Sequence, residues 1–537
     1  MTPRTEASQA SPAVPPSSTP VLPWRALGHL ATVVAILFAV SLVPYLDARL
    51  EDYRYWDRVD ASPLLRAATF TPPPQPEAAL LAGMPAAKDD DEGEISGDDL
   101  DKLAGVTASG AKAGAEPTAG DNAVGEPLEL AEADTPTAPG HRTAVASAEG
   151  PLDIEAKAFG DQKVWLQDPQ ATLDPFFRAL VELAQGRRTY VRIAHYGDSH
   201  TANDGITHVV RQLLQRRFGD GGHGFTLVEG RTQWYVHKGI KRTSAGGWEL
   251  VNFLTGNAKD GAYGYGGVAA DGNPGATFGL ATVPKHPASR MTLYYRSRGR
   301  ATITATLNKK ALAPLEIDTA PGTDGSYTWT APDGVQAMQW RVKAGRVRVY
   351  GGALERDRGL IYDSLGEVGA RGTRWLNADA RHLEGQMRDR PVDLLILNYG
   401  GNERTDKLNE AEYLDQMKQS VARMRAGHPQ GACLLLGPGD HGVKRRGKVV
   451  SDATVWKINQ WQQKLAGQVG CGYFDAIALM GGQGSMGRWV SAGLGWADYS
   501  HFTPRGEQAM GVGIYRALLK GLEQHLQRVK GTTAKAD

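Results

Sequence analysis

The stretch VRIAHYGDSHTANDG, residues 191–205, decides the fold. Its first six residues are predicted to form a strand, Gly197-Asp198-Ser199 forms a turn, and helical apolar spacing follows from 205 to 218. Open α/β sheets place their functional sites at the carboxyl ends of such strands. A helix start after the turn offers free backbone N–H groups and a positive dipole end, which favour negative charge on a substrate oxygen. The turn alone is also an ordinary helix cap, because Asp and Ser are common N-cap residues.

The strand–helix alternation of this stretch recurs along the chain. Apolar spacing predicts further strands at 392–397, 433–436 and 473–477, and helices at 172–185, 411–425, 454–465 and 506–529. Strands that alternate with helices and are apolar throughout indicate a parallel sheet covered on both faces. The sequence therefore predicts an α/β fold.

The alternation is interrupted between residues 231 and 356. Short β-type runs punctuated by Gly, Pro and Asn occur there, so we expect a β-sandwich inserted into the α/β domain. Its aromatic residues can stack on sugars or fill the sandwich core, and the core is the preferred interpretation. They are Trp248, Tyr263, Tyr265, Tyr294, Tyr295, Trp329 and Trp340.

Residues 26–46 contain no Asp, Glu, Lys or Arg and are long enough to cross a bilayer as one helix. Trp24 and Tyr45 flank the segment as residues of a membrane interface do. We therefore expect a transmembrane anchor with its N-terminus in the cytoplasm. A signal peptide cleaved near Ser41 and a buried soluble helix are the alternatives. With an anchor or a signal peptide, the bulk of the chain is exported.

The composition between residues 61 and 148 is rich in Ala, Pro, Gly and acidic residues and poor in aromatics. Such a segment cannot bury enough apolar surface to fold, so we expect a disordered linker. The predicted organisation is a cytoplasmic tail 1–25, the anchor 26–46, the linker 47–157, an α/β domain at 158–230 and 357–537, and the insertion 231–356.

Charge and motif content exclude several classes of protein. The chain of 537 residues has 60 Lys plus Arg against 59 Asp plus Glu, a balance that gives no support to nucleic-acid binding. The G-x-G-x-x-G match at 482–487 is followed by no βαβ unit, and neither G-x-S-x-G nor H-E-x-x-H is present. No histidine or cysteine spacing suits a metal site, so we expect neither metal nor cofactor. Cys433 and Cys471 form one disulfide or remain two buried thiols.

A serine nucleophile needs a base and a group that orients the base. In the segment Asp498-Tyr499-Ser500-His501, ahead of the last helix, the carboxylate can reach the imidazole Nδ1–H and leave Nε2 free for Ser199. Asn402, in a Gly-Gly-Asn turn after the strand 392–397, can donate its amide to an oxyanion. Each segment alone is also compatible with an ordinary cap or turn.

Together these segments resemble the SGNH, or GDSL-type, hydrolase family. Residues 197–200 resemble its first block, in which the serine is the nucleophile and its N–H enters the oxyanion hole. Residues 364–369 resemble the second block, which implies Gly369 as a backbone donor, although Ser364 departs from the usual asparagine. Residues 400–402 match the third block, with Asn402 as side-chain donor, and Asp498 with His501 matches the D-x-x-H block. The resemblance implies a three-layer, flavodoxin-like sheet.

A narrower likeness is to bacterial peptidoglycan O-acetylesterases and related exported carbohydrate esterases, which carry a GDSHT-type block, an inserted β-sandwich and a segment like 362–370. It implies an esterase that removes acyl groups, O-acetyl above all, from a cell-envelope glycan through Ser199, His501 and Asp498. The enzyme would be anchored in the inner membrane and act in the periplasm, or be secreted if the N-terminal segment is cleaved. An O-acetyltransferase with the same triad and a polysaccharide-binding protein with a vestigial site are the alternatives.

Overall fold

The computed structural model describes residues 165–228, 235–282 and 288–533. All of these residues belong to one unit of the chain. The predicted tail, anchor and linker lie outside the described residues. None of the described helices combines the length and apolar character needed to cross a bilayer.

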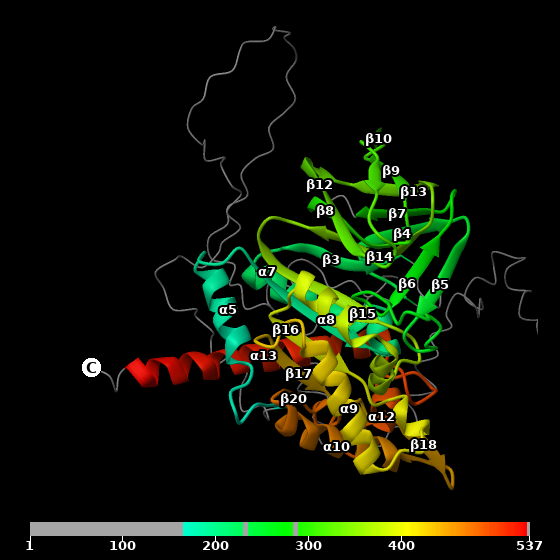
Figure 1. Ribbon diagram of the computed structural model, residues 1–537. Helices are drawn as coiled ribbons and strands as arrows, with labels where there is room; N and C mark the ends of the chain where they lie inside the picture. The colour runs from blue at the N-terminus through cyan, green and yellow to red at the C-terminus, as the bar shows by residue number, and fades with distance from the viewer. Residues whose placement is uncertain (1–164, 229–234, 283–287, 534–537) are drawn as a thin grey trace, which may run out of the picture. The chain divides into compact units, whose positions relative to one another are not determined.

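One six-stranded sheet organises the α/β part (Figure 1). Five of its strands run parallel, as predicted, and the short β1 pairs antiparallel with β20 at one edge. In spatial order the strands are β1 (Leu166–Gln167), β20 (Gly472–Phe474), β17 (Ala432–Leu436), β16 (Leu394–Asn398), β2 (Tyr190–Gly197) and β15 (Gly359–Gly366).

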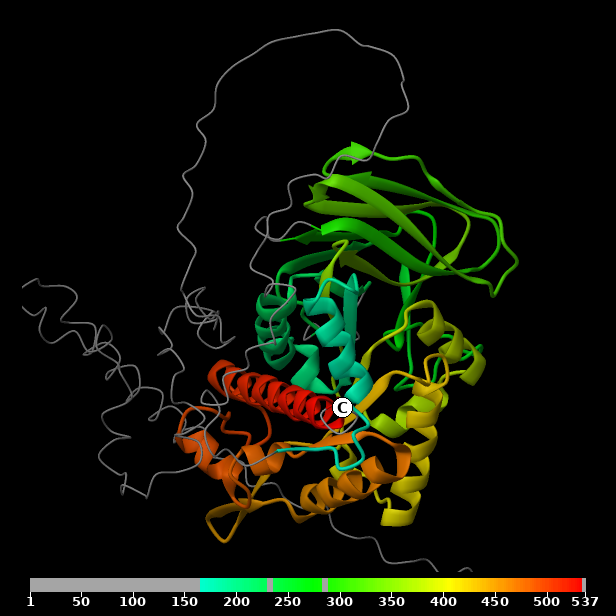
Figure 2. The same cartoon turned by 90° about the vertical axis from the view of Figure 1, so that its left-hand side faces the viewer.

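Alternate residues of each central strand point to opposite faces of this sheet. In β2, Val191 and Ile193 belong to a core shared with one set of helices, and Ala194 and Tyr196 to a core shared with another. The two sets lie on opposite sides of the sheet (Figure 2). The first set is α5 (Asp174–Ala184), α7 (Gly205–Phe218) and α13 (Pro504–Thr533), and the second is α8 (Ala380–Asp389), α9 (Glu410–Arg425) and α10 (Ala453–Val469).

Two antiparallel sheets interrupt the α/β part and share a hydrophobic core of their own. The first sheet holds β10 (Lys310–Ala311), β9 (Ala301–Leu307), β13 (Ala337–Ala344), β7 (Thr277–Thr282) and β4 (Ile240–Ala245), with β11 (Leu315–Ile317) paired to β9. The second holds β12 (Asp324–Val335), β8 (Ala288–Ser297), β14 (Val347–Glu355), β6 (Val268–Gly272) and β5 (Trp248–Asn252), with β3 (Gly222–Leu227) paired to β14. We call these elements the two-sheet region; it begins with β3, ahead of residue 231.

Most aromatic residues of the two-sheet region are core residues. Trp340 and Trp329 are buried between the two sheets, and Tyr263 and Tyr265 are buried against the α/β part. Trp248 and Tyr294 are half-buried. The packing role preferred from the sequence therefore accounts for most of them.

A buried charged cluster connects the two-sheet region to the parallel sheet. Arg390, at the end of α8, donates through Nε and Nη2 to Asp363 of β15 at 2.9 and 2.8 Å. The same Nη2 donates to Glu355 of β14 at 2.8 Å, and Arg192 of β2 reaches that carboxylate at 3.1 Å. Because an unpaired buried charge is costly, this cluster favours a single arrangement of β2, β14, β15 and α8.

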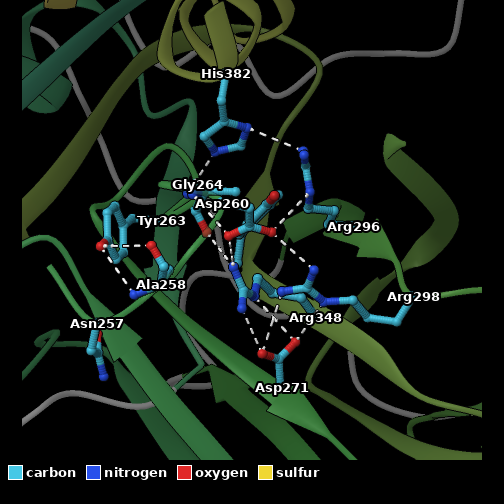
Figure 3. Close-up of polar contacts among 12 residues, drawn as sticks. Asn257, Ala258, Asp260, Tyr263, Gly264, Asp271, Arg296, Arg298, Arg348 and His382 are labelled. Carbon is cyan, nitrogen blue, oxygen red and sulfur yellow. Dashed lines mark hydrogen bonds and ion pairs between the residues drawn. The ribbon is translucent and has the colours of Figure 1, made fainter. Parts of the chain in front are cut away.

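A second charged cluster lies inside the two-sheet region (Figure 3). Asp271 accepts two hydrogen bonds from the guanidinium of Arg348, and Arg298 bonds both Asp271 and Asp260. His382 of α8 accepts a hydrogen bond from the Gly264 backbone N–H at 2.9 Å through Nε2. The cluster therefore gives α8 a further contact with the two sheets.

The remaining elements lie around the carboxyl ends of the parallel strands or lead into them. They are the helices α6 (Ser199–Ala202), α11 (Ala476–Leu479) and α12 (Ser485–Ser491), the 3-10 helices η5 (Gly372–Asn377) and η6 (Glu403–Thr405), and the hairpin of β18 (Gly442–Arg445) and β19 (Lys448–Ser451). Cys433 of β17 and Cys471, just before β20, form a disulfide. This pairing is one of the two alternatives left open by the sequence.

Candidate active site

Ser199 is the first residue of α6, directly after β2. The side chain of Asp198 caps this short helix by accepting a hydrogen bond from the His200 backbone N–H at 3.0 Å. Gly197 allows the sharp turn, since a Cβ there would lie 2.1 Å from Oγ1 of Thr201. The turn therefore presents the hydroxyl of Ser199 at the carboxyl end of a central strand.

Ser199, His501 and Asp498 form one hydrogen-bonded chain. The Ser199 Oγ lies 3.1 Å from Nε2 of His501, and Nδ1 of His501 lies 2.7 Å from Oδ2 of Asp498. The other carboxylate oxygen of Asp498 accepts backbone N–H bonds from Ser500 and His501 at 2.9 and 3.1 Å. Burial raises the pKa of Asp498, but the hydrogen bonds from His501 and Ser500 outweigh it, so the net pKa is lowered. An ionised carboxylate on Nδ1 is the arrangement that orients a histidine base.

The loop that carries Asp498 and His501 is closed by backbone hydrogen bonds. The Trp496 N–H donates to the His501 carbonyl at 2.8 Å, and the Tyr499 N–H donates to the Trp496 carbonyl at 3.0 Å. Tyr499 has a φ of 56°, in the left-handed region, which lets the loop fold back on itself. The His501 side chain remains 49% exposed, so solvent reaches the base.

Two of the backbone N–H groups predicted for the oxyanion hole lack an acceptor in the described part of the chain. Within the described residues, the N–H groups of Ser199 and Gly369 have no hydrogen-bond acceptor. Gly369 has a φ of 78°, a conformation that favours glycine. Asn402 lies close by: its Nδ2 is 3.0 Å from the Ala370 carbonyl and 3.3 Å from Oδ2 of Asp198. All three groups predicted for an oxyanion hole thus come together, although the Asn402 amide has partners within the protein here.

Ser364, the departure from the family pattern, has a local partner. It is buried in β15, and its Oγ lies 2.8 Å from Oγ1 of Thr207 in α7 and 3.3 Å from the Thr201 carbonyl. The hydroxyl therefore holds α6 and α7 against β15.

His200 was not singled out by the sequence as a site residue. Its Nδ1 lies 3.2 Å from Oδ1 of Asp198 and its Nε2 lies 3.0 Å from the Ser500 carbonyl, and its ring stacks on His501 at 5.4 Å. Burial lowers the pKa of His200, but the Asp198 carboxylate and the Ser500 carbonyl raise it more. His200 thus joins the nucleophile turn to the loop of the base. The only signal in the sequence is its place next to Ser199.

His441 and Glu403 are two further buried residues of the site that the sequence did not assign. His441 follows β17, and neither ring nitrogen has a hydrogen-bond partner among the described residues. Burial lowers the pKa of His441 to about 3, so the ring is neutral. A Cβ on Gly401 would lie 3.2 Å from its Nε2 and 3.3 Å from Oδ2 of Asp198, which places His441 next to the Asn402 turn. No motif marks either residue.

The described residues contain no group of three or more His, Cys, Asp or Glu side chains arranged to hold a metal ion. What the arrangement offers is a serine hydroxyl with a histidine acceptor and free N–H groups beside it. This is the equipment for attack on a carbonyl followed by stabilisation of the oxyanion.

Comparison with known sequences supports this chemistry. Residues 326–509 match the sequence model of the GDSL-like lipase/acylhydrolase family. The match includes Gly369, Asn402, Asp498 and His501 and begins after Ser199. No curated protein matches the chain.

Comparison with solved structures supports the fold. The structure of a peptidoglycan O-acetylesterase aligns with a TM-score of 0.58 and 22% sequence identity, covering 67% of this chain and 99% of the other. The salicylyl-acyltransferase SsfX3 from a tetracycline biosynthetic pathway aligns with a TM-score of 0.26 and 12% identity, over 53% of this chain and 95% of the other. A family two carbohydrate esterase from Cellvibrio japonicus aligns with a TM-score of 0.22 and 11% identity, over 53% of this chain and 99% of the other. The first likeness shows that the chain shares the fold of that structure; the other two scores are too low to bear on it.

Proposed function

We propose that this hydrolase, an esterase with a GDSL-like acylhydrolase domain, removes O-acetyl groups from a cell-envelope glycan such as peptidoglycan. The observation that carries the proposal is the hydrogen-bonded chain Ser199–His501–Asp498 at the carboxyl end of β2. A serine, a histidine and an ionised carboxylate in this order form a nucleophile, a general base and an orienting group.

In the proposed reaction His501 takes the proton of Ser199 while the hydroxyl oxygen attacks the ester carbonyl. Asp498 holds the imidazole in the tautomer that leaves Nε2 unprotonated and stabilises the imidazolium that forms. His501 then passes its proton to the sugar oxygen as the ester C–O bond breaks, and the sugar leaves as an alcohol. In the second step His501 takes a proton from water, the water oxygen attacks the acyl-enzyme, and the proton returns to the Ser199 oxygen as acetate leaves. Each step needs only the groups of this chain, the ester and water.

The oxyanion is bound by the backbone N–H groups of Ser199 and Gly369 and by the amide of Asn402. Each donor of this kind contributes about 3 kcal/mol in enzymes that use it. The two unpartnered N–H groups support this assignment. To take part, the Asn402 amide exchanges its 3.3 Å contact with Asp198 for the substrate oxygen.

Two arguments support the choice of substrate and location. Residues 26–46 have the length and apolar character of an anchor or export signal, which supports a location outside the cytoplasm. The structural neighbour with the TM-score of 0.58 is a peptidoglycan O-acetylesterase. We therefore propose an enzyme anchored in the inner membrane and acting in the periplasm on an acetylated glycan.

Transfer of the acyl group to a glycan hydroxyl is the competing reaction of the same triad. Transfer requires that water be kept from the acyl-enzyme. The His501 and Asp498 side chains are each 49% exposed, so water reaches the base freely and hydrolysis is favoured. Measuring acetate release with and without added acceptor glycan separates the two, because transfer lowers the acetate released.

Substitution of the triad tests the proposal on a chromogenic acetate and on O-acetylated peptidoglycan. We expect Asp498→Asn to lower kcat by about 10⁴-fold because it favours the wrong tautomer of His501, with losses at least as large for Ser199→Ala and His501→Ala. Ser326→Ala, at an exposed serine of β12, is the matched control and should keep full activity. Full activity in Ser199→Ala would disprove the mechanism.

A further inference from the structure

The hairpin of β18 and β19 presents four cations within five residues. Lys444, Arg445, Arg446 and Lys448 are all exposed or half-exposed, and within the described part of the chain no carboxylate forms an ion pair with any of them. The whole chain carries a net charge of only +1, so this concentration of positive charge is local. Unpaired cations on one hairpin create a positive potential that attracts anionic polymers.

The turn of this hairpin has an unusual residue. Arg446 and Gly447 form a two-residue loop with φ angles of 49° and 77°. Such turns favour Asn or Gly at the first position, since a longer side chain is disfavoured at positive φ. A cation therefore stands at the tip of the hairpin against the local backbone preference.

The hairpin is attached to the loop that carries the candidate base. The Gly442 N–H donates to the Tyr499 carbonyl at 2.8 Å, and the Lys444 Nζ lies 5.4 Å from the centre of the Tyr499 ring. At the other end, the Ser451 hydroxyl donates to the buried Asp440 at 3.0 Å. These hydrogen bonds, at Gly442 and at Ser451, therefore hold the cations of the hairpin beside the loop of His501.

Trp496 lies on the same loop and is exposed. At 54% exposure it is the most exposed of the large hydrophobic side chains in the described part of the chain, whereas Trp375 and Trp489 are buried. Its backbone N–H is bonded to the His501 carbonyl, so its position relative to the base is fixed. A flat aromatic face in water offers a stacking surface for the apolar face of a sugar ring.

From these observations we propose that Trp496 and the β18–β19 hairpin form a binding surface for a carboxylate-bearing glycan strand that leads into the active site. Trp496 stacks on a sugar, and the cations of the hairpin contact the carboxylates of the strand or of its substituents. The inference rests on the proposed function, which supplies the reaction. It adds that the polymer on which the enzyme acts is acidic. Such a surface acts through KM and association, because it lies beside the triad and not in it.

Binding by the full-length chain in a Ser199→Ala background tests the surface separately from catalysis. The probes are O-acetylated peptidoglycan sacculi, whose peptides carry carboxylates, and the same sacculi after amidation of those carboxylates. We expect replacement of Lys444, Arg445, Arg446 and Lys448 by Gln to weaken cosedimentation with untreated sacculi about tenfold at low salt and to remove most of its salt dependence. The protein with an intact hairpin should bind amidated sacculi about as weakly as the hairpin variant binds untreated sacculi.

A matched control removes four exposed cations elsewhere. Lys310, Arg341 and Lys343 lie on strands of the first sheet of the two-sheet region, and Lys309 lies in the turn before β10. Replacement of all four by Gln should leave binding unchanged. Trp496→Ala should weaken binding to both kinds of sacculi by a similar factor, because stacking does not depend on carboxylates.

The remaining outcomes separate this inference from the proposed function. With Ser199 intact, the hairpin variant should raise KM on sacculi and leave kcat on a chromogenic acetate unchanged. Three results would each overturn the proposed surface. The hairpin variant binds sacculi as tightly as the protein with an intact hairpin, or the control variant binds them as weakly as the hairpin variant. The third is that the protein with an intact hairpin binds amidated sacculi as tightly as untreated ones. Full hydrolysis by Ser199→Ala would instead overturn the mechanism and leave the binding result valid.

Discussion

At the scale of single residues, Glu403 is a buried carboxyl group that holds the turn before Asn402. Its Oε1 accepts the Gly372 N–H at 2.8 Å and its Oε2 accepts the Gly400 N–H at 3.0 Å. Burial raises the pKa of Glu403 to about 7; the charge of Asp198 adds to this and the backbone N–H groups oppose it. This carboxyl group therefore titrates near neutral pH while supporting the candidate oxyanion site.

A pH-dependent stability follows for Glu403. The unfolded chain ionises this group near its ordinary value of 4.5, whereas the folded protein does so only at about 7. Between these values the unfolded state binds fewer protons, so the free energy of unfolding falls as the pH rises, and the stability present below 4.5 is lost by about pH 7. The gap corresponds to about 3 kcal/mol as an upper bound. Urea unfolding between pH 4.5 and 8 should show that Glu403→Gln removes this slope.

Below pH 4.5 the substitution should also lower stability, because the amide nitrogen cannot accept a hydrogen bond and leaves one backbone N–H without its acceptor. Glu384→Gln, at a half-exposed glutamate of α8, is the matched control and should keep the slope of the unsubstituted protein. An unchanged slope in Glu403→Gln would show that the carboxyl group titrates at its ordinary pKa.

Some residues of the site can be predicted from their sequence context, and others cannot. Ser199, Asp498 and His501 stand in short motifs at the ends of predicted elements, and these motifs together resemble the blocks of one family, so the three residues can be predicted from the sequence. His200 and His441 depend on contacts between loops 200 or more residues apart, such as that of His200 with the Ser500 carbonyl. One sequence carries no signal for such long-range contacts, so these two residues become visible only in the folded chain.

At the scale of elements, the disulfide joins β17 to the start of β20. Cys433 and Cys471 are separated by 38 residues, and both sulfurs lie near the amino-terminal ends of these strands. The candidate active site lies at the opposite, carboxyl ends. The bond therefore restrains the unfolded chain without contacting the site.

We expect Cys433→Ala/Cys471→Ala to lower the free energy of unfolding by about 2 to 4 kcal/mol, the range expected for closing a loop of this length. Hydrolysis of a chromogenic acetate should be unchanged at temperatures where the variant is folded. A reductant that reaches the disulfide should lower the free energy of unfolding of the unsubstituted protein by the same amount and leave that of the variant unchanged. Unequal losses would indicate that packing of the two side chains, and not the cross-link, supplies the stability.

The elements themselves were predictable where the sequence pattern is continuous. The apolar runs that become β16 and β17 were predicted within two residues of their observed ends, because strands buried on both faces are apolar throughout. The strand β3, with the sequence GHGFTL, has two glycines and no alternation, so its pairing with β14 was not expected. The hairpin of β18 and β19 was missed for a related reason: its KRRGK centre has the composition of a solvated loop.

At the scale of the whole molecule, one arginine connects elements of both parts. Arg390 of α8 bonds Asp363 of β15, Glu355 of β14 and the Tyr294 hydroxyl of β8, at 2.8 to 3.1 Å. Burial raises the pKa of Glu355, but the charges of Arg390 and Arg192 outweigh it and lower the pKa to about 2. The carboxylates are thus stable inside the protein only while their cations are present. The two-sheet region and the parallel sheet should therefore unfold together.

Arg390→Met tests this coupling. Removing one partner of a buried ionic cluster typically costs about 3 to 5 kcal/mol, since the remaining carboxylates stay buried with fewer cations to compensate them. Without the charge of Arg390, burial raises the pKa of Glu355, so the loss should be largest at neutral pH and should shrink at lower pH as this group takes up a proton. Calorimetry should show one transition for the unsubstituted chain and an earlier, separate transition of the two-sheet region for the variant. Arg388→Met, two residues earlier and 64% exposed, should melt like the unsubstituted protein. If Arg390→Met also melts in one transition at an unchanged temperature, the hydrophobic core shared by the two parts, and not the ionic cluster, holds them together.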